Sequence, residues 1–99
     1  MSGPELSQAT ERRVSLLFAP EERDEVRRIL EDKCGNNLPF CKDLDSIQLE
    51  RIRFGVLKLS EGNREKLERA VRLAAQDWRD LLMASGFAND VHAHESWVP

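Results

Sequence analysis

The chain has no long hydrophobic run. Apolar residues make up 40% of it but are spread among charged ones, and no segment approaches the roughly 18 consecutive apolar residues that a membrane-spanning helix needs. The first residues, Met1 to Glu5, also lack the basic stretch followed by an apolar stretch that marks a secretory signal. We therefore expect a cytoplasmic protein with no membrane association.

The chain also lacks a strong excess of either charge. Its 15 Lys and Arg and 18 Asp and Glu give a net charge of −3, which provides no general attraction to nucleic acids or anionic membranes. The distribution is uneven, because Lys and Arg outnumber Asp and Glu by eight to four between Arg51 and Arg79, and no Lys or Arg follows Arg79. We do not expect a nucleic-acid partner, although a local basic face stays open as an alternative.

Catalytic motifs are absent as well. The sequence has no nucleophile elbow, phosphate-binding Gly loop or metalloprotease motif. A dyad of Cys41 with His92 or His94, oriented by Asp90, can be drawn, but no motif supports it. We therefore expect a protein that is not an enzyme and carries no cofactor.

There are only two cysteines, Cys34 and Cys41, and a reducing cytosol keeps such thiols free. Together with His92 and His94 they are the weak candidates for a zinc site. Six residues separate the cysteines, whereas structural zinc sites place them two to four apart. On a helix, the two histidines would project about 200° apart. No metal is predicted, and a small enzyme or zinc protein built on the Cys34–Cys41 loop and these histidines is an alternative.

The length and the hydrophobic periodicity predict a mainly α fold. Ninety-nine residues are enough for one core, and the pattern indicates a small single-domain bundle of about four helices. Residues 1–10 are expected to form a flexible N-terminal arm, and residues 11–99 the helical domain. The segment Arg12–Phe18 fits either a helix or a strand, and helix is favoured because no second strand exists to pair with it. The other helices are predicted over residues 20–34, 45–59, 64–85 and 90–97.

The helix over residues 64–85 has the strongest signals and is predicted to be the spine of the domain, with the C-terminal segment folded back on it. Asn63 is the expected N-cap, and Gly86 followed by Phe87 is typical of a Schellman end. Glu65 with Arg69, and Glu68 with Arg72, are spaced to pair. A buried stripe is expected along one face, and it consists of Leu67, Ala70, Val71, Ala74, Trp78, Leu81 and Leu82. In the preceding helix Gly55 indicates a close helix crossing, for which Ala70 and Ala74 offer small surfaces.

The apolar residues exceed what one helical face can bury, which predicts a protein-interaction or regulatory module that binds a protein partner or a second copy of itself. Leu73, Ala75 and Met83 lie beside the buried stripe. The residues expected at the interface are Leu38, Phe40, Leu73, Trp78, Met83 and Trp97.

A helix-turn-helix nucleic-acid-binding protein is the main alternative. Its two helices would be joined by the short turn Ser60–Gly62. The basic side chains available to it are Arg51, Arg53, Lys58, Arg64, Lys66, Arg69 and Arg72. Acids alternate with bases along the second helix, which is more typical of a solvated face.

Overall fold

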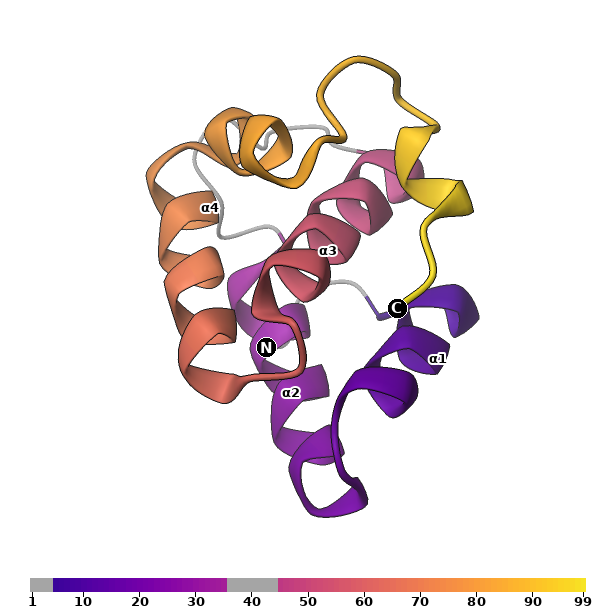
Figure 1. Cartoon of the computed structure of the whole chain (residues 1–99), viewed down its shortest axis with the longest axis vertical. Helices are drawn as coiled ribbons and strands as arrows, with labels where there is room; N and C mark the ends of the chain where they lie inside the picture. Colours follow the sequence, from indigo (N-terminus) through magenta and orange to yellow (C-terminus); the bar gives the residue numbers. More distant parts are fainter. Residues whose placement is uncertain (1–4, 36–44) are drawn as a thin grey trace.

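The structure, a computed structural model, describes residues 5–35 and 45–99 of the chain. Four α-helices follow one another (Figure 1): α1 (Gln8–Leu17), α2 (Pro20–Lys33), α3 (Ser46–Ser60) and α4 (Arg64–Ser85). A short 3₁₀-helix, η1 (Ala93–Ser96), lies near the C-terminus. The described residues contain no strand, so the predicted mainly α bundle is confirmed.

The segment Arg12–Phe18, whose pattern fits either a helix or a strand, is part of helix α1 as far as Leu17. This helix begins at Gln8, inside the segment expected to be a flexible arm. The reason is a local cap: the Ser7 hydroxyl accepts a hydrogen bond from the Thr10 amide at 3.1 Å, and Thr10 is fully buried. Helix α1 therefore begins closer to the N-terminus than the hydrophobic pattern indicated.

Helices α2 and α3 begin at residues of the types that favour a helix start. Pro20 occupies the first turn of α2, where its missing amide costs no hydrogen bond. Asp45 caps α3, because its carboxylate accepts a hydrogen bond from the Gln48 amide at 2.8 Å.

The central element of the domain is α3, not α4 as predicted. Every residue from Arg51 to Leu57 is buried, so α3 is covered on all sides, whereas α4 buries one face. In Figure 1, α3 lies between α4, α1 and the C-terminal segment. The sequence favours α4 as the central helix because α4 is longer and more regularly amphipathic. A strongly one-sided pattern, however, is typical of a peripheral helix that buries one face.

The close helix crossing predicted at Gly55 is present, but its partner is different. A Cβ atom on Gly55 would lie 3.1 Å from Ser85 Oγ and 3.4 Å from Leu81 Cδ2. The small surface opposite Gly55 is therefore Ser85, in the second half of α4, and not Ala70 or Ala74.

Helix α4 bends at Asp77, whose backbone is extended (φ −164°, ψ 108°). The Asp77 carboxylate accepts a hydrogen bond from the Arg79 amide at 3.0 Å, so Asp77 caps the second half of the helix. Figure 1 shows this half running in a different direction from the first half, and it packs beside the middle of α3, where Gly55 meets Leu81 and Ser85. The helix ends in the predicted Schellman motif, in which Gly86 has φ 84° and the Phe87 amide donates to the Leu82 carbonyl at 2.9 Å.

The C-terminal segment differs from the predicted helix over residues 90–97. Only residues 93–96 are helical, as the 3₁₀-helix η1. The segment packs on α3 and α1 rather than running back along α4: His94 contacts Glu50 and Phe54, and the Trp97 carbonyl accepts hydrogen bonds from Arg13. The Asn89 side chain does not cap a helix, because η1 begins after His92.

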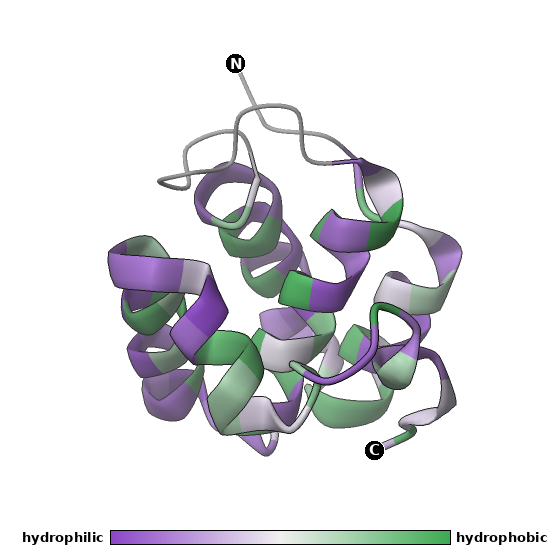
Figure 2. Ribbon diagram, turned by 90° about the horizontal axis from the view of Figure 1, so that it is seen from above, coloured by the Kyte–Doolittle hydropathy of each residue, from purple (hydrophilic) through white to green (hydrophobic). Residues whose placement is uncertain are grey.

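One hydrophobic core joins all four α-helices. The largest fully buried side chain is that of Phe54, and Val14, Val26 and Leu67 bring α1, α2 and α4 to the same core. Figure 2 shows hydrophobic and hydrophilic residues alternating along the helices, as expected for elements that bury one face. None of the described helices is long and apolar enough to cross a membrane.

Candidate functional site

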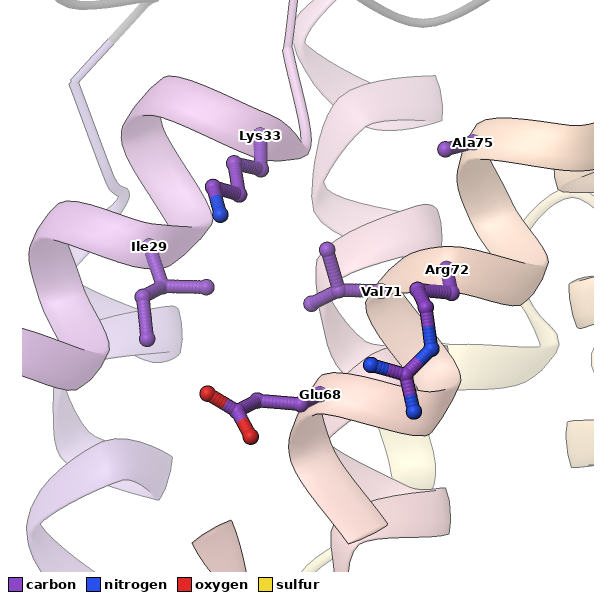
Figure 3. A pocket seen from close by; sticks show the side chains of 6 residues that line it. All are labelled: Ile29, Lys33, Glu68, Val71, Arg72 and Ala75. Atoms are coloured by element: carbon purple, nitrogen blue, oxygen red, sulfur yellow. The ribbon is translucent and has the colours of Figure 1, made fainter. Parts of the chain in front are cut away.

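A groove of about 420 Å³ lies between α2 and the first half of α4. Its lining residues are Ile29, Lys33, Glu68, Val71, Arg72 and Ala75. The two helices run in the same direction along it, and Ile29 faces Val71 across the space (Figure 3). The volume lies within the range of sites that bind small molecules or the side chains of a partner.

The two ends of the groove differ. At the start of α4, the Arg64 guanidinium donates a hydrogen bond to the Glu25 carboxylate of α2 at 2.8 Å, which ties the helices together. This bond lowers the pKa of Glu25 and raises that of Arg64. At the other end, Ala75 is followed by the bend at Asp77, where α4 changes direction. The groove therefore lies between the Arg64–Glu25 ion pair at one end and the bend at Asp77 at the other.

The floor of the groove is apolar and its charged groups stand around it. Val71 is 7% exposed, Ile29 is partly buried, and Ala75 is exposed. Figure 3 shows the Lys33 and Glu68 side chains reaching into the space from opposite helices. Of the two ion pairs predicted along α4, Glu65–Arg69 forms at 3.3 Å, whereas Glu68 and Arg72 are not paired with each other. An apolar floor with charged edges suits an amphipathic segment of polypeptide.

Four of the six residues predicted to form an interface are described by the structure, and these four are not brought together. Leu73 is partly buried on the other side of α4, Trp78 is partly buried just after the bend, and Met83 is 70% exposed further along the helix. Leu38 and Phe40 lie outside the described residues. Trp97 is partly buried and packs against the core, with its ring 6.1 Å from that of Phe54.

The candidate zinc ligands that the structure describes differ in their burial and in their contacts. Cys34 is fully buried, and burial raises the pKa of its thiol to about 12. His92 is exposed and hydrogen bonded to Glu95, which raises its pKa. His94 is fully buried. Cys41 lies outside the described residues, and within them no three His, Cys, Asp or Glu side chains are placed to share a metal ion.

His94 belongs to an aromatic cluster with Phe54, Phe87 and Trp97. Its ring meets that of Phe54 edge-on at 5.1 Å, and its Nε2 lies 3.2 Å from the Glu50 carboxylate. Edge-on contacts of this kind are favourable packing arrangements. The cluster holds the C-terminal segment against α3, which gives His94 a packing role.

Three basic residues of α3 bind backbone carbonyl groups inside the domain. Arg51 donates to the Phe87 carbonyl from Nε at 2.9 Å and from Nη2 at 2.6 Å, and Arg53 donates to the Cys34 carbonyl at 3.0 Å. Lys58 donates to the Ser85 carbonyl at 2.8 Å. Arg51 and Arg53 are 8% and 3% exposed, so burial lowers the pKa of both guanidinium groups. These side chains connect segments of the fold and do not point to an outside ligand.

Only part of the groove could be recognised from the sequence. Ala75 stood out as an apolar residue beside the buried stripe, but Ile29, Lys33, Glu68 and Arg72 carried no signal that would link α2 to α4. Comparisons of the chain with protein-family models, curated proteins and solved structures found no match.

Proposed function

We propose that this domain is a non-enzymatic protein-interaction module, located in the cytoplasm, and that the α2–α4 groove binds a segment of a partner protein. The observation that carries the proposal is the pairing of an apolar floor, formed by Ile29, Val71 and Ala75, with charged side chains from both helices. An amphipathic helix that inserts apolar side chains into a groove between two helices is a common mode of peptide recognition.

The surroundings of the groove support binding rather than catalysis. Its titratable lining residues are Lys33, Glu68 and Arg72, and neither a histidine nor a cysteine is among them. Acyl or glycosyl transfer would need a nucleophile beside a base, or two carboxylates facing one another. The single carboxylate, Glu68, supplies neither arrangement.

The proposal is tested by selecting peptides that bind the wild-type protein but not a variant whose groove is blocked. A phage-displayed random peptide library is selected on the wild-type protein and counter-selected on Ala75→Glu, which places a charged side chain over the floor. Ala84→Glu is the matched control, since it makes the same change at an exposed position beyond the bend.

Selected peptides should shift the amide resonances of Ile29, Val71 and Ala75 in the ¹H–¹⁵N spectrum. They should bind Ala75→Glu at least about tenfold more weakly, a loss of about 1.4 kcal/mol, and bind Ala84→Glu like the wild type. Two results would overturn the proposal: peptides that bind Ala75→Glu as tightly as the wild type, or a selection that enriches no peptide.

A further inference from the structure

A second apolar groove, of about 280 Å³, lies on the opposite side of α4. Its lining residues are Leu59, Lys66, Arg69, Ala70 and Leu73. At 100° per residue, Lys66 and Leu73 project to one side of α4 and Glu68 and Ala75 to the other. The outward face of the helix, with Arg69 and Arg72, therefore stands between two grooves.

The surface formed by the two grooves is basic, although the chain as a whole is acidic. Among the lining residues of both grooves, the cations are Lys33, Lys66, Arg69 and Arg72, and the one acid is Glu68. The net charge of the chain is −3. This excess of cations among the lining residues favours a partner of negative charge at this surface.

Two of the cations, Lys66 and Arg69, are paired only weakly with neighbouring acids. Lys66 lies 3.3 Å from Glu61, and Arg69 lies 3.3 Å from Glu65, with all four side chains well exposed. Exposed pairs of this kind contribute about 0–1 kcal/mol. Arg72 has no hydrogen bond or ion pair with the described residues. The carboxylates of a partner can therefore pair with Lys66, Arg69 and Arg72 at little cost.

We infer that the partner segment is an acidic amphipathic helix that crosses α4 and inserts one apolar side chain into each groove. A helix with its side chains is about 10 Å wide, and two residues seven positions apart on a helix are separated by about 10.5 Å along its axis. Two apolar anchors one heptad apart therefore span α4 from groove to groove. Nucleic acid fits this surface less well, because both floors are apolar. The inference rests on the function proposed above and adds the chemistry of the partner.

The experiment uses designed helical peptides of about 20 residues, long enough to form a helix in water. The first carries glutamates and two leucines seven positions apart, the second has only one of the leucines, and the third has lysines in place of the glutamates. Binding is measured by calorimetry at low and high salt and mapped by amide shifts.

The two-anchor acidic peptide should shift Leu73 as well as Ala75, bind at least about tenfold more tightly than either other peptide, and weaken as salt is added. Leu73→Glu should reduce its affinity to that of the one-anchor peptide, whereas Ala84→Glu should leave it unchanged.

Three results would overturn the inference, and they differ in what they say of the proposed function. If the one-anchor and two-anchor peptides bind equally and shift only the α2–α4 groove, the second groove is not used, and the proposed function stands. If a DNA duplex shifts both grooves more strongly than the acidic peptide, both proposals fail. If sedimentation shows self-association that Ala75→Glu abolishes, the occupant is a second copy of this chain.

Discussion

The guanidinium group of Arg13 donates two hydrogen bonds to the carbonyl oxygen of Trp97, from Nε at 3.1 Å and from Nη2 at 2.9 Å. The same group lies 4.2 Å from the centre of the Phe54 ring. The first helix thereby holds the last residues of the chain against α3. Neither residue carries a sequence signal for this contact.

Replacing Arg13 should destabilise the domain strongly. We expect Arg13→Met to lower the free energy of unfolding by about 2–4 kcal/mol, because it removes charged hydrogen bonds and a cation–π contact. Arg13→Lys should not restore stability, since an ammonium group cannot donate in the same fork. Urea unfolding measures the loss, and the exposed neighbour Arg12, changed to Met, should cost less than about 0.5 kcal/mol.

The crossing at Gly55 predicts a coupled pair of substitutions. Gly55→Ala should destabilise the domain by about 1 kcal/mol, because the contact with Ser85 Oγ at 3.1 Å outweighs the gain in helix propensity. In a Ser85→Ala background the oxygen is absent, and the same change should be neutral or stabilising. Additive effects in this double-mutant cycle would contradict the contact.

The cap at the α4 bend predicts which substitutions Asp77 tolerates. Asp77→Ala should lower the melting temperature by a few degrees, because the Arg79 amide loses its acceptor. Asp77→Asn should keep most of the stability, and Asp80→Ala is the exposed control. Arg79 also lowers the pKa of Asp77, so this stabilisation is present above the ordinary carboxyl pKa and is lost as pH falls through the lowered value.

The His92–Glu95 contact predicts a pH dependence of opposite sign. Glu95 raises the pKa of His92, so the stabilisation is complete below the ordinary histidine pKa of about 6.5 and is lost as pH rises through the higher folded value. An NMR titration should find the His92 pKa above 6.5 and find it lowered by Glu95→Gln. Glu21→Gln, on α2, should leave it unchanged.

Burial of Cys34 predicts an unreactive thiol. In a Cys41→Ser variant, Cys34 should react with a disulfide reagent only as fast as the protein unfolds, because its pKa is raised to about 12. Above pH 8.5 or so the unfolded chain loses this proton and the folded one keeps it, so stability should fall as pH rises. Cys34→Ala should remove that part of the pH dependence, and rapid labelling of the folded protein would contradict the burial.

Only a few residues of the candidate site could be predicted from the sequence. Ala75 and Leu73 are recognisable as apolar residues beside the stripe of α4, and they line grooves on opposite sides of that helix. Their partners, Ile29 on α2 and Leu59 on α3, depend on which helices become neighbours. A pattern of hydrophobicity within one helix shows which face is buried, but not against what.

The sequence by itself determined the four α-helices, because caps and periodicity act over a few residues. Asn63 and Gly86 mark the ends of α4 as expected. The helical state of residues 12–17 follows from the lack of a strand to pair with. Tertiary structure alone decided that α3 is central and that buried arginines join distant carbonyl groups. It also decided that two grooves flank α4. These features arise from packing between elements far apart in the chain, which local preferences do not encode.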